Sequence, residues 1–289
     1  EIIVYDKRNS DRGLNTFFGL AGNLLEHDFD LAILPHRSFR TGSISLLARL
    51  PQRVGFSGSS GSIFYTQKVE RPGEIPEPER MLALLKPFGG AKPCPTELFP
   101  GEDNKKRAAE FFQRHDLTGK ILAAAPGSVW GTKRYPPELF AEAIDLVSSR
   151  LNYSAAVLIA GPEDSRLCGE VQELAKSPVF SAAGWGDILT SAEIISRCDL
   201  LIGNDSAPVH IAATMGTPVI AIFGPTMPRF GFVPYGEHVS VVEPMEELDC
   251  RPCSPHGKMT CPRGDHACMI SIFPEDIVRE AEKLLGGMN

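Results

Sequence analysis

The stretch GNDSAPVH at residues 203–210 follows the apolar run LLI at 200–202 and leads, through a helical segment, to a second apolar run, VIAIF, at 219–223. Apolar runs separated by a helix predict two buried parallel strands with that helix between them. Ser206 is a favourable helix N-cap, and Pro208 lies in the first turn, where a missing N–H costs nothing. We therefore expect free backbone amides and the positive end of a helix dipole at a sheet edge, which suits a diphosphate. An ordinary capped helix is the alternative.

A second strand end carries groups suited to phosphate. The apolar run ILAAA at 121–125 breaks at PGS (126–128), and TKRY (132–135) precedes a helix expected to last to about residue 150. A lysine is a compact charge for a phosphate, whereas an arginine can donate two parallel hydrogen bonds to its oxygens. Solvated turn residues are the alternative for either cation alone, but two such strand ends in one sheet favour a phosphate-binding site.

Together these motifs resemble the bacterial lipopolysaccharide heptosyltransferases of glycosyltransferase family 9, and within them the heptosyltransferase II branch. The resemblance rests on PGS…KRYP, GNDSAPVH and GPT (224–226), and extends upstream to FDLAILP (29–35), PQRVGF (51–56) and ERMLALL (79–85). It implies an α/β protein with the GT-B fold, in which two Rossmann-like domains flank a cleft. It also implies transfer of heptose, with inversion, from ADP-L-glycero-D-manno-heptose to the inner core of lipopolysaccharide.

The chain alternates strands and helices on both sides of a proline-containing segment, residues 87–102, which we expect to join the two domains. We expect an acceptor-binding domain over 1–100 and a nucleotide-sugar-binding domain over 101–289. By the resemblance, a final helix at 275–285 packs back on the first domain. The patterns predict strands at 2–5, 31–34, 121–125, 155–160, 199–203 and 218–223, and helices at 14–26, 44–50, 81–86 and 103–115.

By the resemblance, residues at both strand ends bind the donor and its phosphates. The residues implied are Ser128, Thr132, Lys133, Arg134, Asp205, Ser206, Ala207 and His210. Phosphates repel a carboxylate, so we expect Asp205 to order the loop or to bind sugar hydroxyls. For His210, one helical turn beyond the cap, packing or capping is favoured over acid–base chemistry. Gly184 and Trp185 are expected near the nucleotide base or ribose, where Trp185 either stacks on the ligand or merely packs.

The catalytic base is not assigned to any residue of this sequence. In the family, the presumed base is the aspartate of a glycine-aspartate motif after the first strand, and family sequences begin on the order of 60 residues before Glu1. Nothing in residues 1–30 reproduces that motif. We therefore expect the base in a preceding segment. The alternatives are a transferase of the same fold for another nucleotide sugar and a non-catalytic sugar-nucleotide-binding protein.

The charges of residues 31–69 indicate where an acidic acceptor binds. This segment contains no Asp or Glu, but it contains Arg37, Arg40, Arg49, Arg53 and Lys68. Such a surface attracts carboxylates and phosphates, and an arginine can bind a carboxylate through two hydrogen bonds. Arg37 and Arg40 follow a predicted strand end, so we expect these two to contact the acceptor. Solvation of a helix surface is an equal alternative for the arginines at 49 and 53.

Four of the seven cysteines, Cys250, Cys253, Cys261 and Cys268, share one loop. Four thiolates at this spacing could hold a structural zinc ion, although the second pair is not a CxxC motif. Free thiols or redox-dependent bridges are the favoured interpretation, and no required cofactor is expected.

Composition narrows the class of protein further. The net charge of −7 argues against a nucleic-acid-binding protein. No apolar run approaches the roughly 18 residues that cross a bilayer, and residues 1–15 show no secretory signal. We expect a cytoplasmic monomer with at most peripheral contact at the inner face of the cytoplasmic membrane.

Overall fold

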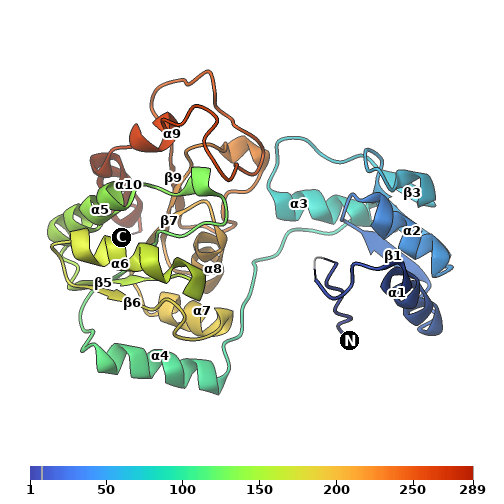
Figure 1. The fold of residues 1–289 in the computed structure, drawn as a ribbon, viewed down its shortest axis with the longest axis horizontal. Coiled ribbons are helices and arrows are strands. Elements are labelled where there is room, and N and C mark those ends of the chain that lie inside the picture. Colours follow the sequence, from blue (N-terminus) through green and yellow to red (C-terminus); the bar gives the residue numbers. More distant parts are fainter. Residues whose placement is uncertain (8, 289) are drawn as a thin grey trace. The chain divides into compact units, whose positions relative to one another are not determined.

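The computed structural model describes residues 1–7 and 9–288 and divides the chain into two compact units (Figure 1). Unit 1 comprises Glu1–Cys94 and unit 2 comprises Pro95–Asn289. The division falls inside the segment 87–102, whose prolines cannot donate to a helix or a strand ladder.

Unit 1 contains a small parallel sheet in the order β1-β2-β3. Its strands are β1 (Leu31–Leu34), β2 (Gln52–Phe56) and β3 (Gln67–Val69); its helices are α1 (Leu14–Glu26), α2 (Phe39–Leu47) and α3 (Glu77–Leu82), with 3-10 turns at Ser62–Phe64 and Ala83–Phe88. The core is formed by Val54, Phe56, Val69, Ala83 and Leu84. α1 packs on α2, as expected for a helical connection beside a parallel sheet.

Two predictions for unit 1 were wrong. Residues 2–5 form no strand, because the described residues offer them no strand partner; instead the Tyr5 ring lies under the Arg40 guanidinium, 5.1 Å from its centroid. The helix predicted at 44–50 begins at Phe39 and ends at Leu47. Its early start follows from the Ser38 hydroxyl, which accepts a hydrogen bond from the Thr41 amide at 3.1 Å and so caps the helix.

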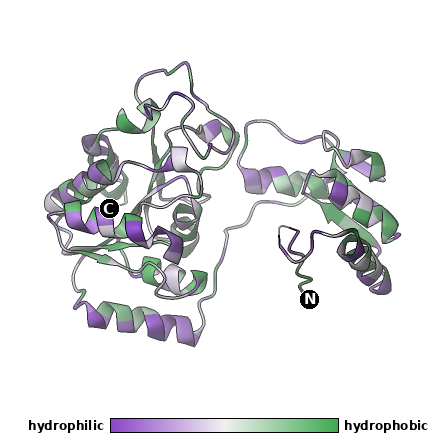
Figure 2. Ribbon diagram, in the orientation of Figure 1, coloured by the Kyte–Doolittle hydropathy of each residue, from purple (hydrophilic) through white to green (hydrophobic). Residues whose placement is uncertain are grey.

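Unit 2 is a six-stranded, wholly parallel sheet in the order β6-β5-β4-β7-β8-β9. The strands are β4 (Ile121–Ala125), β5 (Ala155–Leu158), β6 (Val179–Ser181), β7 (Leu200–Asn204), β8 (Val219–Ile222) and β9 (Val239–Val242). Every residue of β4, β5, β7 and β8 is buried, and apart from the last two residues of β7, Gly203 and Asn204, these strands are built of apolar residues (Figure 2). Parallel strands covered on both faces require such continuous apolar runs.

Helices cover both faces of this sheet. They are α4 (Glu102–Arg114), α5 (Pro137–Leu151), α6 (Ser165–Leu174), α7 (Ile188–Ser196), α8 (Ala207–Met215), α9 (Ala267–Ile270) and α10 (Pro274–Gly286). One core joins the sheet to α5, α6 and α10, and the other joins it to α4, α7 and α8. α10 packs on α5 and β9 through Ile277, Val278 and Ala281. Its predicted contact with the first domain stays a prediction.

The strand order places a topological switch point between β4 and β7. From β4 the chain proceeds outward to β5 and β6, then returns to β7 and continues outward through β8 and β9. β4 and β7 are hydrogen-bonded neighbours, with Ala125 opposite Gly203 at their carboxyl ends. Open parallel sheets bind ligands in the crevice beyond such a point, because the loops on either side lead away in opposite directions. In the described part of the chain, no helix combines the length and apolarity needed to cross a membrane.

Candidate functional site

Asn204, the last residue of β7, holds the two loops of the switch point together. Its side chain is fully buried. The amide Nδ2 donates to the carbonyl of Pro126 at 2.7 Å, and Oδ1 accepts from the backbone N–H of Tyr135 at 3.2 Å. The loop after β4 is thereby fixed at both of its ends to the end of β7. This role of Asn204 was not predicted from the sequence.

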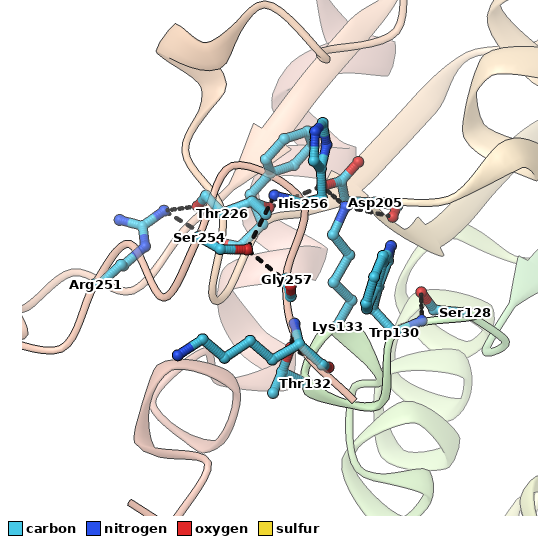
Figure 3. A network of polar contacts seen from close by, with 12 residues as sticks. Ser128, Trp130, Thr132, Lys133, Asp205, Thr226, Arg251, Ser254, His256 and Gly257 are labelled. Atoms are coloured by element: carbon cyan, nitrogen blue, oxygen red, sulfur yellow. Dashed lines mark hydrogen bonds and ion pairs between the residues drawn. The ribbon is translucent and has the colours of Figure 1, made fainter. Parts of the chain in front are cut away.

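The ammonium of Lys133 and the carboxylate of Asp205 form the charged centre of the site. Lys133 Nζ lies 2.5 Å from Asp205 Oδ2 and 3.4 Å from the Asp205 carbonyl oxygen. The side chains are only 10% and 6% exposed, respectively, so water screens the pair little. The Thr226 hydroxyl, in the turn that follows β8, donates to the same carboxylate oxygen at 2.8 Å. Three strand ends therefore converge on Asp205 (Figure 3).

Helix α8 begins directly beside this pair. Ser206 occupies the N-cap position, as predicted, and Pro208 lies in the first turn. The predicted capping bond is not formed, however: among the described residues the Ser206 hydroxyl makes no cap contact, and its buried Oγ has no hydrogen-bond partner there. The extended backbone of Ser206 leads the chain into the helix without that bond, with φ −154° and ψ 177°. The first N–H groups of an α-helix have no intrahelical partners. The start of α8 therefore combines free hydrogen-bond donors with the positive end of the helix dipole.

Arg134 supports the loop after β4. Its Nε donates to the Ser128 carbonyl at 2.8 Å, and its Nη2 pairs with Asp164 at 2.9 Å, beyond the end of β5. The Ser128 hydroxyl in turn accepts from the Trp130 amide at 3.3 Å. These contacts order the loop around Lys133. The roles predicted for Ser128 and Arg134 toward a phosphate stay predictions.

A segment far along the chain, residues 254–258, lies against the loop that carries Lys133. The Thr132 amide and hydroxyl both donate to the Lys258 carbonyl, at 3.1 and 2.9 Å, and the Lys258 amide donates back to the Thr132 hydroxyl at 2.8 Å. Gly257 adopts φ +85°, and a Cβ at this position would lie 3.1 Å from Lys133 Cγ and 3.2 Å from Lys133 Cε. Ser254 Oγ closes the turn by donating to the Gly257 carbonyl at 2.7 Å (Figure 3). No periodic pattern of residues predicts this contact.

His210 lies one turn into α8 and is exposed at its surface. Partial desolvation lowers the pKa of its imidazole below the usual range; of the two nearby charges, Asp205 raises that pKa and Lys133 lowers it. The lowered pKa favours the neutral imidazole. The side chain is exposed and so does not show the packing favoured by the sequence, and the donor-binding role predicted for His210 stays a prediction.

Trp185 packs against α4. Its indole N–H donates to the Arg107 carbonyl at 2.9 Å, its ring meets Phe111 edge-on at 5.2 Å, and the Arg114 guanidinium lies 5.5 Å from its centroid. The packing interpretation of Trp185 is therefore the one the structure favours. Gly184 forms the turn beside it, and a nucleotide-binding role for the two residues stays a prediction.

The two arginines predicted to bind an acceptor differ in their surroundings in unit 1. Arg37 is exposed, with Nη2 donating to the Gly58 carbonyl at 3.1 Å. Arg40 is partly buried: its guanidinium bonds the Tyr5 hydroxyl and stacks on Phe17, 5.2 Å from the ring centroid. Arg37 thus remains open to a ligand, whereas Arg40 orders the N-terminal segment.

The cysteines at 250, 253, 261 and 268 are free thiols. Burial raises the pKa of the Cys268 thiol to about 11. Within the ranges 1–7 and 9–288, no group of three or more His, Cys, Asp or Glu side chains is arranged to hold a metal ion. The zinc interpretation therefore gains no support from the geometry.

Two units, each built on a parallel sheet, are the architecture of the GT-B fold. A match to glycosyltransferase family 9 (heptosyltransferase) extends over residues 18–264, so the chain belongs to this family.

Individual relatives agree. Lipooligosaccharide heptosyltransferase 2 of Campylobacter jejuni is 33% identical over 172 residues, which cover 57% of this chain and 51% of the relative. The chain therefore matches about half the length of that relative. The crystal structure of a family 9 glycosyl transferase from Veillonella parvula superposes with a TM-score of 0.85 at 26% identity, covering 99% of this chain and 82% of the other. E. coli ADP-heptose LPS heptosyltransferase II shares the fold, with a TM-score of 0.72 at 20% identity and coverage of 95% and 82%.

Proposed function

We propose that the protein transfers heptose from ADP-L-glycero-D-manno-heptose to the inner core of lipopolysaccharide, with inversion at the anomeric carbon. The observation that carries the proposal is the meeting of the Lys133 ammonium and the start of α8 at Asp205, on the switch point of unit 2. The names of the relatives support the choice of heptose and of a lipopolysaccharide acceptor.

In this proposal the donor diphosphate lies between Lys133 and the first turn of α8. The ammonium and the backbone amides there bear opposite charge to the diphosphate, which gains negative charge as it leaves the sugar. These groups are held in place before the donor binds, because Lys133 is paired with Asp205 and covered by the segment 254–258. The unpartnered Ser206 hydroxyl supplies one further donor at the helix start. No metal ion is needed for such charge stabilisation.

Asp205 takes the role of ordering the loop. Its carboxylate bonds both Lys133 and Thr226, which leaves it less free to repel an incoming phosphate than an unpaired carboxylate would be. A proton acceptor for the attacking hydroxyl is still required, and the proposal assigns no residue to that role.

The acceptor is proposed to approach unit 1 at Arg37. Inner-core sugars carry carboxylates and phosphates, and an exposed guanidinium binds both through two parallel hydrogen bonds. Peripheral contact with the inner face of the cytoplasmic membrane, a cytoplasmic location and a monomeric state complete the proposal.

The nucleotide and the sugar can be tested together. Purified protein is titrated calorimetrically with ADP, UDP and GDP, and then incubated with ADP-heptose and a lipopolysaccharide inner core that carries the accepting sugar but lacks the heptose to be added. We expect ADP to bind most tightly and the core to gain the mass of one heptose. Tighter binding of another nucleoside diphosphate, together with no gain in mass, would overturn the proposal.

A further inference from the structure

Arg251 lies outside the strand-end loops but binds the turn that follows β8. Its Nε donates to the Gly224 carbonyl at 2.6 Å, and its Nη2 donates to the carbonyls of Phe223 at 3.1 Å and Thr226 at 2.9 Å. The side chain is only 10% exposed, and its charge is balanced by an ion pair with Glu243.

One guanidinium thus binds three backbone carbonyl groups of the turn 223–226. The planar fork of an arginine suits this task, because its donors point in fixed directions, whereas a lysine ammonium carries donors on a flexible stem. A backbone hydrogen bond also holds this turn: the amide of Cys253, two residues after Arg251, donates to the Pro225 carbonyl at 3.1 Å.

The turn matters because it aims the Thr226 hydroxyl. Arg251 binds the Thr226 carbonyl, and the Thr226 side chain donates to Asp205 Oδ2 at 2.8 Å, the oxygen that also pairs with Lys133. Figure 3 shows this sequence of contacts from Arg251 through Thr226 and Asp205 to Lys133. Nearly every group in it is shielded from water, so displacement of one member is transmitted to the next.

We propose that Arg251 is a positioning residue for the diphosphate site, acting through Thr226 and Asp205 on the Lys133 ammonium. The inference rests on the proposed function, since it assumes that Lys133 binds the donor diphosphate. Without Arg251, the turn loses its three-point anchor, Thr226 no longer holds Asp205, and the carboxylate is free to follow Lys133 or to face the phosphates.

The test uses Arg251→Met, Thr226→Val and the double variant, with ADP affinity measured by calorimetry. Both single variants are expected to raise the ADP Kd about fivefold. The double variant is expected to raise it no further than the larger single effect, because both changes interrupt the same sequence of contacts. The KM for the lipopolysaccharide acceptor should stay within about twofold, a selectivity that a general loss of stability does not produce.

Arg263→Met is the matched control. Arg263 belongs to the same loop and pairs with Asp265 at 3.0 Å, but its side chain is 52% exposed. This variant should keep the wild-type ADP Kd. Arg251→Lys retains the charge and part of the donor set, so it should recover part of the affinity lost in Arg251→Met.

Two outcomes would overturn the inference: an ADP Kd that stays at the wild-type value in Thr226→Val, or single effects that multiply in the double variant. If Arg251→Met does not fold, Thr226→Val still tests the contact with Asp205, because valine has nearly the shape of threonine, and Arg251→Lys tests the arginine itself. Binding of ADP to the wild-type protein tests the proposed function. The ADP Kd of each variant relative to that of wild type tests the role of Arg251.

Discussion

Lys133 Nζ lies 2.5 Å from Asp205 Oδ2, and the two side chains come from loops 72 positions apart in the sequence. The pair joins the ends of β4 and β7 at the switch point of the sheet. It also sets the charge at the start of α8, because Asp205 immediately precedes the N-cap residue Ser206. Removing one charge of such a buried ion pair is destabilising, because the other charge is left buried without a partner.

Replacement of Asp205 by asparagine should therefore lower the free energy of unfolding by about 3 kcal/mol. The amide keeps the shape and one acceptor, but it leaves the Lys133 ammonium without a counter-charge in a site only 10% exposed. Urea denaturation measures the loss. Asp145→Asn serves as the control, because the Asp145 carboxylate lies outside the site and accepts hydrogen bonds from the backbone amides of Lys176 and Ser177, with no cation paired to it by an ion pair among the described residues. A loss in Asp205→Asn no greater than in the control would show that the pair contributes nothing to folding.

Gly257→Ala should weaken ADP binding as well as folding. The backbone there has φ +85°, and the added methyl group would press on the Lys133 side chain. Gly264, in the same loop, also has a positive φ of +77° but has no atom within 4 Å of the added carbon. Both variants should lose about 1–2 kcal/mol through backbone strain, measured by urea denaturation. Only Gly257→Ala should raise the ADP Kd, and equal ADP affinities would contradict the contact.

Tyr135→Phe should reduce stability and leave the ADP Kd unchanged. The buried Tyr135 hydroxyl donates to the Ile272 carbonyl at 2.6 Å and so links the loop after β4 to the start of α10. Removing the donor leaves that carbonyl without its partner, at a cost of about 1–2 kcal/mol. Thermal unfolding in the presence and absence of ADP measures both effects; an altered ADP Kd would mean that this bond also shapes the ligand site.

His210 makes the protein more sensitive to acid. The pKa of its imidazole is lowered in the folded state, so the unfolded chain binds the proton more readily. The contribution of His210 to stability is complete above the unfolded pKa of about 6.5 and is lost as the pH falls below it. His210→Gln should lose less stability than wild type between pH 7.5 and pH 5.5. Identical pH profiles from urea denaturation would show that the shift does not act on folding.

The strands of unit 2 could be predicted well from the sequence, because each strand is marked by the residues of its own segment. Strands buried on both faces need continuous apolar runs, and those runs mark β4, β5, β7 and β8 directly. The loops that carry Lys133 and Asp205 follow such runs, so their place at one sheet edge follows from the parallel order alone. The start of α8 at Ser206 was likewise signalled by its own residue types.

The remaining features depend on contacts that no local pattern contains. The segment 254–258 and Arg251 reach the site across long stretches of chain, and loop residues carry no periodicity. The predicted strand at 2–5 had suitable residues but no strand partner among the described residues, and strand pairing is not a property of one segment. Arg40 was assigned to an acceptor from its charge and its place after a strand end, and that role stays a prediction; its contacts with the Tyr5 and Phe17 rings could not be read from the sequence.

The central claim, that Lys133 and the start of α8 bind a donor diphosphate, is tested most directly by ADP titration of Lys133→Met against Lys120→Met. Methionine removes one positive charge in each variant while keeping an unbranched side chain, and Lys120 is exposed beside Tyr153, away from the strand-end contacts. We predict that ADP raises the melting temperature of wild type and of Lys120→Met equally and does not raise that of Lys133→Met. An ADP-dependent shift in Lys133→Met as large as that of wild type would contradict the account.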